Sequence, residues 1–196
     1  DDIPPPPATG ATVAIDLSAA GANILLQQVA PAVFADDDAT EDIVAGTPRI
    51  VGDVRLGALS DTFNILAGTV AGDIAFGAGA DSLTIDNGAI YTGSITDTDG
   101  ALTINVQNGV MNFSGGSLNI TSATFGASSQ LNALLSGVPS GTTNIVASGS
   151  VTFAPGAVVT PAVPTGLPSS GTQTFLTANG GMFGAGNVVG AVNPLN

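Results

Sequence analysis

GDIAFGAGADSLTIDNG, residues 72–88, is the stretch of sequence that decides the fold. Its second half, Asp81 to Ile85, alternates polar and apolar residues, and a period of two is typical of a β-strand. Leu83 and Ile85 therefore lie on one face of that strand, and the polar residues beside them face the other way. The glycines before Asp81 supply turn chemistry. The stretch predicts two short strands joined by a glycine-rich corner.

The same pattern recurs along the middle of the chain. Glycine-led runs begin at Gly52, Gly72 and Gly93, and an alternating run ending in isoleucine follows each of them. Repeats of about 20 residues are typical of solenoids, because one unit cannot bury its apolar face alone. The sequence therefore predicts an all-β fold, a right-handed parallel β-helix (β-solenoid) with a C-terminal capping segment.

The spacing of the apolar residues also predicts how the coils stack. Successive isoleucines from Ile65 onward are 20, 19 and 16 positions apart, and a second apolar residue stands two positions before each. Parallel stacking then aligns equivalent side chains inside the helix. The two expected interior ladders are Ile65, Ile85, Ile104 and Ile120, and Phe63, Leu83, Leu102 and Leu118.

Composition divides the chain into four parts. Residues 1–10 form a proline-rich linker or leader, and residues 11–48 hold irregular strands and an acidic loop. Residues 49–127 carry the solenoid repeats, and residues 128–196 are expected to form the capping segment.

The capping segment is expected to be built differently from the repeats. Residues 129–135 have the apolar spacing of a helix of one or two turns that ends at Gly137. Thr143 to Phe153 and Gln173 to Ala178 are expected to be strands, with a proline-rich stretch between them.

The charge of the chain restricts its function. The formal net charge is −13, with two basic residues and neither Cys nor His. Nucleic-acid binding needs a cationic surface, and anionic membranes repel such a chain. Without Cys and His, thiol nucleophiles, Ser-His-Asp triads and Cys/His metal sites are excluded. From Gly100 to Asn196 no side chain is ionisable, so this half lacks groups for acid–base catalysis.

Three short runs near the C-terminus carry a family resemblance. They are GSVTFAPG at residues 149–156, GTQTFL at residues 171–176 followed by Ala178, and GGMFG at residues 180–184. Together they resemble the passenger C-terminus of classical bacterial autotransporters, in which a β-helical segment precedes a membrane barrel. The resemblance covers roughly residues 52–193.

This resemblance implies a role, a partner and a location. The segment would be a structural stalk, or would nucleate folding, within an exported passenger, without catalysis of its own. Its partner would be a membrane barrel of the same parent chain, following Asn196. The location would be extracellular, on the bacterial cell surface or outer membrane. An active module, if there is one, would precede Asp1.

Asp61 and Asp81 are the candidate metal ligands. Residues 77–83 match most of the calcium nonapeptide repeat, and residues 57–63 match less of it. In that repeat, Asp carboxylates and carbonyls of consecutive nine-residue turns share each ion. Here the two copies are 20 residues apart. The sequence therefore favours a structural turn and no cofactor, with calcium binding as the alternative.

Other acidic and polar residues support alternative functions. Asp97 and Asp99 flank a turn and could act as the acid pair of a β-helical carbohydrate-active enzyme, although a turn-forming role is favoured. The acidic run Asp36 to Asp42 is expected to be a solvated loop rather than a cation site. Outward-facing Thr and Ser would suit glycan or matrix contact. An adhesin or S-layer-like interaction module on a host or matrix surface is thus the first alternative, and the enzyme is the second.

Overall fold

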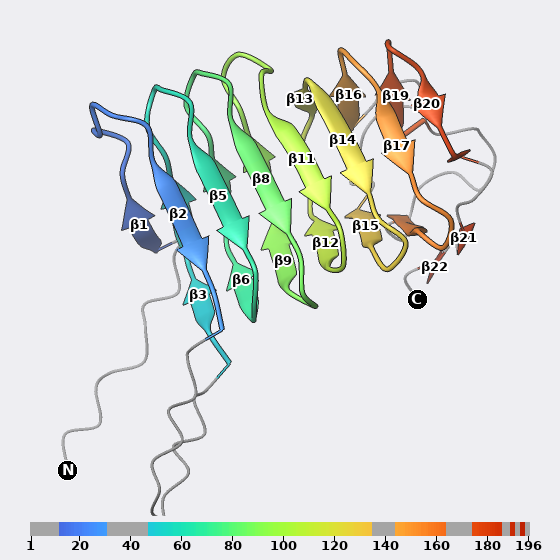
Figure 1. Cartoon of the computed structure of the whole chain (residues 1–196), viewed down its shortest axis with the longest axis horizontal. Helices are drawn as coiled ribbons and strands as arrows, with labels where there is room; N and C mark the ends of the chain where they lie inside the picture. Colours follow the sequence, from blue (N-terminus) through green and yellow to red (C-terminus); the bar gives the residue numbers. More distant parts are fainter. Residues whose placement is uncertain are drawn as a thin grey trace, which may run out of the picture.

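The computed structural model describes residues 12–30, 47–134, 144–163, 174–185, 189–190 and 193–194. These residues form parallel β-strands and no α-helix. The strands stack along one axis as a parallel β-helix, and Figure 1 shows neighbouring coils following one another in sequence order from β2 to β20. The predicted fold class is confirmed.

Each coil contributes three strands, one to each side of the helix. The first strand of a coil belongs to sheet A in the first four coils and to sheet D in the last three. Sheet A contains β1 (Val13–Asp16), β4 (Asp53–Arg55), β7 (Ile74–Ala75) and β10 (Ile95–Thr96). Sheet D contains β13 (Leu118–Ile120), β16 (Ile145–Ala147) and β19 (Leu176–Ala178).

The second and third strands of the coils form two longer sheets. Sheet B contains β2 (Leu25–Gln28), β5 (Thr62–Ile65), β8 (Ser82–Ile85), β11 (Thr103–Val106), β14 (Ser122–Phe125), β17 (Val151–Phe153) and β20 (Met182–Phe183). Sheet C contains β3 (Arg49–Val51), β6 (Thr69–Ala71), β9 (Ile90–Gly93), β12 (Val110–Phe113), β15 (Gln130–Leu134), β18 (Val158–Val163) and β21 (Val189–Gly190), and β22 (Asn193–Pro194) also pairs with β18.

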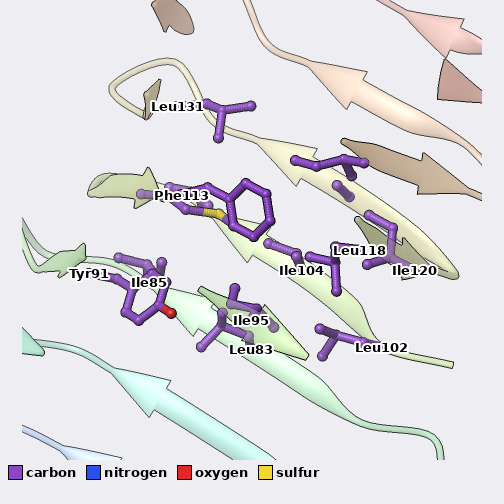
Figure 2. Close-up of a cluster of buried hydrophobic side chains, with 14 of the residues drawn as sticks. Leu83, Ile85, Tyr91, Ile95, Leu102, Ile104, Phe113, Leu118, Ile120 and Leu131 are labelled. Atoms are coloured by element: carbon purple, nitrogen blue, oxygen red, sulfur yellow. The ribbon is translucent and has the colours of Figure 1, made fainter. Parts of the chain in front are cut away.

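Apolar side chains fill the space between the sheets. Leu83, Ile85 and Ile104 of sheet B are at most 2% exposed, as predicted from their alternation. Figure 2 shows side chains from successive coils pointing into this interior. Most of them are small or branched aliphatic side chains, which suits a narrow core. Tyr91 and Phe113 of sheet C add aromatic volume to it.

The interior ladders differ from the expected ones in register. Ile104 stacks on Leu83, not on Ile85, whose partner is Val106. The corner before β11 is longer than the isoleucine spacing suggested, so equivalent residues here are 21 positions apart. A shift of two residues keeps each side chain on the same face of its strand. The inward face was therefore predicted correctly, and the pairing beyond Ile85 was wrong.

The remaining members of the expected ladders lie on other parts of the coil. Leu102 precedes β11, at the corner rather than in the strand. Leu118 and Ile120 belong to β13 of sheet D, where Leu118 pairs with Ile145. All three are buried, so they do contribute to the core.

Residues 129–135 do not form the expected helix. Strand β15 occupies Gln130–Leu134 and pairs in parallel with β12 and β18. Leu131 and Ala133 are fully buried, whereas Asn132 between them is partly exposed. This alternation has the period of a strand. The neighbouring coils supply hydrogen-bond partners for the backbone N–H and C=O groups of β15, whereas an isolated helical turn would leave most of them without partners.

The stack extends on both sides of residues 49–127. β1 and β2, from the N-terminal part, pair with β4 and β5. Strands β16 to β20, from the C-terminal part, continue sheets B, C and D. The described strands of the capping segment thus repeat the three-strand coil and do not have a different layout. Residues 1–10, including the proline-rich run, lie outside the described residues, as does the acidic run Asp36 to Asp42.

Glycines allow the coils to approach closely where sheet C leads into sheet A. A Cβ on Gly72 would lie 2.1 Å from the carbonyl oxygen of Gly52, and a Cβ on Gly93 would lie 2.0 Å from that of Gly72. Any other residue would clash with the backbone of the preceding coil. The glycines that mark the repeat in the sequence therefore stack on one another.

Candidate functional site

The aspartates singled out in the sequence gather at the corner that precedes sheet B. Asp61 and Asp81 each stand one residue before a strand, and they occupy equivalent positions because Thr62 pairs with Ser82. Leu102 takes the same position in the next coil. The two aspartates are only 1% and 2% exposed, so their carboxyl groups are removed from water.

Asp61 joins two coils through its carboxylate. Oδ1 accepts the backbone N–H of Ile24, in the preceding coil, at 2.8 Å. Oδ2 accepts the N–H of Gly57, four residues earlier in the same coil, also at 2.8 Å. Both oxygens thus accept backbone N–H groups, one buried and one partly buried. Hydrogen bonds to an ionised acceptor are stronger than those to a neutral one.

Asp81 repeats half of this arrangement. Its Oδ1 accepts the N–H of Asp61 at 2.7 Å. Its Oδ2 is buried and has no hydrogen-bond partner. Burial, together with the negative charges of Asp61, Asp97 and Asp99, raises the pKa of Asp81 to about 6. Asp81 therefore favours the neutral form more than an ordinary aspartate does.

Asp97 and Asp99 bind the backbone at the same corner. Asp97 Oδ2 accepts the N–H of Leu102 at 2.9 Å. Asp99 accepts the N–H of Gly79, one coil back, at 2.8 Å and that of Ala101 at 3.1 Å. Burial raises the pKa of Asp97, whereas the hydrogen bond from Gly79 lowers the pKa of Asp99.

A second row of aspartates lies where the chain enters sheet A. Asp53 accepts the N–H of Asp73 in the next coil at 3.1 Å. Asp73 in turn accepts the N–H of Ser94, again one coil further on, at 2.8 Å. The sequence shows this row as an acid that follows the glycine of the first two repeats, but its partners 20 and 21 residues away are visible only in the structure.

Five of the described aspartates thus link neighbouring coils, namely Asp53, Asp61, Asp73, Asp81 and Asp99. Within the described ranges, no three acidic side chains converge to form a metal-ion cluster. Asp61 and Asp81 adjoin each other, but three of their four oxygens accept backbone N–H groups. A calcium ion would have to compete with those donors.

A cavity among the described residues lies away from the aspartates. It has a volume of about 320 Å³ and lies in the last coils, where Phe153, Val159, Leu176 and Met182 contribute to its lining. Its remaining lining residues are Pro161, Phe175 and Ala185. The lining contains no ionisable side chain, so neither Asp97 nor Asp99 faces this space.

Several buried polar residues, Tyr91 and Gln28 among them, were not identified from the sequence. Tyr91 is fully buried, and its hydroxyl donates to the carbonyl of Ser94 at 2.5 Å. Burial raises the pKa of this phenol, which keeps the hydroxyl protonated. Gln28 stacks on Ile65 and donates through Nε2 to the carbonyl of Ala67 at 2.6 Å. The alternation of residues around Tyr91 could have predicted that its side chain points inward. Nothing in the sequence around Gln28 predicts that this polar side chain is buried.

Comparison with known proteins adds no relative. Neither the family models nor the curated proteins nor the solved structures give a match to this chain. Within the described residues, there is no helix long and apolar enough to cross a membrane.

Proposed function

We propose that this chain is a structural segment of an exported surface protein, serving as a stalk or a folding-nucleating segment and performing no catalysis of its own. The observation that carries the proposal is the use of the acidic side chains. Asp61, Asp73 and Asp99 accept backbone N–H groups of neighbouring coils, so groups that could have done chemistry hold the stack together.

The shape of the molecule supports the same role. The described strands form seven coils stacked along one axis. Neighbouring coils pair through sheets B and C and also through sheet A or D, except between β10 and β13, which do not pair. Such a quasi-one-dimensional stack transmits force along its length and separates what lies at its two ends. The resemblance to autotransporter passengers adds a context, in which the segment stands between a membrane barrel of the same parent chain and the medium.

Surface display tests this proposal. The chain is placed between an epitope tag and an outer-membrane barrel in a Gram-negative host, and the tag is detected on intact cells by antibody and by protease sensitivity. We expect display at the level of an established β-helical stalk. Failure of display, with a well-folded isolated chain, would contradict the proposal.

A pair of variants tests whether display requires the folded β-helix. Ile85→Asp places a charge in the core and should abolish display, whereas Thr84→Asp, on the outer face of the same strand, should leave it intact. Equal display of both variants would mean that the folded coil is not needed.

A further inference from the structure

The cavity in the last coils marks a place where the packing of the β-helix interior changes. In the middle coils the inward side chains are almost fully buried, as Leu83 and Ile85 are. In the last coils, the inward-facing Phe153, Val159 and Leu176 line a space of about 320 Å³. At this end of the stack, the described side chains therefore leave the interior incompletely filled.

Glycines stand at two positions where the following coil would otherwise supply inward side chains. In sheet C, Val159 pairs with Gly190. In sheet B, the pairing of β17 with β20 ends one residue before Phe153, and the residue that comes next after β20 is Gly184. Gly184 has a φ of 69°, so the chain leaves the strand conformation there. Neither glycine carries a side chain that could extend over the phenyl ring or the valine of the preceding coil.

The ring of Phe153 determines which chemical group suits this space. One of its faces stacks on Phe125 of the preceding coil, with ring centroids 5.0 Å apart and planes 11° apart. The cavity lies toward the following coil, because Met182 of that coil also lines it. Stacked aromatic rings attract each other at this separation, which is close to the spacing of about 4.8 Å between neighbouring strands. A flat aromatic group in the cavity would therefore extend the existing stack by one layer.

The lining of the cavity favours a neutral ligand. Its described residues are aliphatic, aromatic or, in Met182, a thioether that makes favourable contacts with aromatic rings. From Gly100 to Asn196 no side chain is ionisable, so a charged ligand would find no partner of opposite charge here. Burying an unpaired charge is costly.

The cavity has room for more than one ring and is accessible from solvent. An apolar cavity of about 150 Å³ holds one benzene molecule, and this one is about twice as large. Phe153, Val159 and Leu176 are at most 8% exposed, whereas Met182 is 41% exposed. The first three thus form the floor of the cavity, and Met182 lies at its mouth.

We propose that this cavity binds a neutral aromatic small molecule of about two rings, with one ring stacked on Phe153. The apolar floor provides affinity through burial of the ligand, and the stack on Phe153 favours flat rings over saturated ones. The inference is independent of the proposed stalk function, because it concerns only the interior of the last coils.

Fluorescence titration of the full chain with two related dyes tests this proposal. The first is N-phenyl-1-naphthylamine, which is neutral and fluoresces strongly in apolar surroundings. We expect saturable binding of one molecule per chain with a submillimolar Kd. The second is 1-anilinonaphthalene-8-sulfonate, which has the same rings and a negative charge. It should bind at least about tenfold more weakly, because the cavity offers no cation.

Matched variants locate the binding site. Val159→Phe places a ring inside the cavity and should weaken binding of the neutral dye by about tenfold or more. Val158→Phe makes the same change at the preceding position of β18, which is partly exposed, and should bind the dye as the unmodified chain does. Phe153→Leu keeps the floor apolar but removes the stacking ring, and should weaken binding by about fivefold. Circular dichroism melts show which variants are folded.

Three results would overturn the proposal. They are the absence of saturable binding of the neutral dye, equal affinity for the two dyes, and equal binding by folded Val159→Phe and Val158→Phe. If Val159→Phe does not fold, Phe153→Leu decides the matter, and unchanged binding of the neutral dye by that variant would place the dye elsewhere.

Discussion

The coils before Gly100 and the coils after it share one architecture but are held together by different chemistry. In the first group, aspartates accept backbone N–H groups across coils, as Asp61 and Asp73 do. The second group has no ionisable side chain. There, the rings of Phe125 and Phe153 in adjacent coils stack with centroids 5.0 Å apart, and Ser129 Oγ donates to the carbonyl of Gly126 within its own corner at 2.7 Å.

This difference teaches that the parallel β-helix does not depend on one type of corner. What the two groups have in common is that inward apolar residues alternate with outward residues along their central strands. The acidic corners add hydrogen bonds whose strength depends on protonation, whereas hydroxyl and aromatic contacts do not titrate. Stability should therefore respond to core changes in both groups, and to pH only in the first.

The largest expected effect is common to both groups. Ile85→Asp would place a carboxylate between Ile65 and Val106, and Val151→Asp would do the same in an uncharged coil. An unpaired buried charge costs several kcal/mol, similar to the whole stability of a domain. We expect both variants to be unfolded or badly destabilised in thermal melts followed by circular dichroism.

The neighbouring outward positions provide the controls for this prediction. Thr84→Asp and Thr152→Asp carry the same charge on the solvent side of β8 and β17 and should change the free energy of unfolding by less than about 0.5 kcal/mol. Equal damage from an inward and an outward aspartate would mean that the faces are misassigned.

The sequence predicted the faces of the strands but not their partners. Alternation identifies Leu83, Ile85 and Ile104 as inward, because the period of a strand is local. The register depends on the length of the corner at residues 97–101, and a two-residue shift leaves the apolar pattern unchanged. Nothing in the spacing of the isoleucines could therefore reveal it.

The corner aspartates show the same limit. A turn-forming role for Asp97 and Asp99 was predictable, since short acidic side chains often bind nearby backbone N–H groups. The bond between Asp61 and Ile24 joins residues 37 positions apart. It could not be inferred before the coils were stacked. For residues 129–135 even the local prediction was wrong. The two adjacent leucines, Leu134 and Leu135, hid the two-residue period of the strand and favoured a helix.

Truncation is expected to have the next largest effect. Removal of residues 128–196 deletes β15 and all later strands, leaving the edge of β14 unpaired and Phe125 without Phe153. Removal of residues 1–47 deletes only β1 and β2 from the described strands. Exposed edges and ladder ends favour aggregation. We expect the C-terminal truncation to lose solubility and cooperative melting more severely.

Two outcomes of the truncation experiment would contradict this prediction. A chain lacking residues 128–196 that stays soluble and melts as sharply as the full chain would mean that the uncharged coils do not cap the acidic ones. Greater damage from removing residues 1–47 would instead place the stabilising end at β1 and β2.

The acidic corner itself should contribute less than the core. Asp61→Ala leaves the N–H groups of Ile24 and Gly57 without their acceptor. Each buried donor without a partner costs about 1–3 kcal/mol. Ser129→Ala, in an uncharged coil, removes a hydroxyl donor and should cost about 1 kcal/mol. Urea unfolding of both variants measures the difference, and an equal loss would contradict a special role for the carboxylate.

Acidic pH should stabilise the first group of coils. The pKa of Asp81 is about 6 in the folded chain and near 3.8 when unfolded, so the folded state binds more protons between these values. Stability contributed by the neutral form is then present below about pH 3.8 and is lost as the pH rises through 6. Asp97 acts in the same direction, while Asp16 and Asp99, with lowered pKa values, act in the opposite one.

Hydrogen exchange can locate this pH effect in the stack. After correction for intrinsic exchange rates, amides of β5 and β8 should be better protected at pH 4.5 than at pH 7, with a smaller change in β14 and β17. Asp81→Asn should remove most of the difference. A pH response that is equal in the two groups of coils, or unchanged in Asp81→Asn, would assign it to another acid.

The smallest expected effect is that of calcium. Both carboxylate oxygens of Asp61 accept backbone N–H groups, from Ile24 and Gly57, and one oxygen of Asp81 accepts the N–H of Asp61. A calcium ion prefers six to eight oxygen ligands, and this corner offers it one carboxylate oxygen free of backbone bonds. Millimolar calcium should therefore leave the melting temperature nearly unchanged, with magnesium as the matched control for ionic strength. A calcium-specific rise of more than about 10 °C, abolished in Asp81→Asn, would show that the ion displaces the backbone donors and that the acidic coils form a true calcium site.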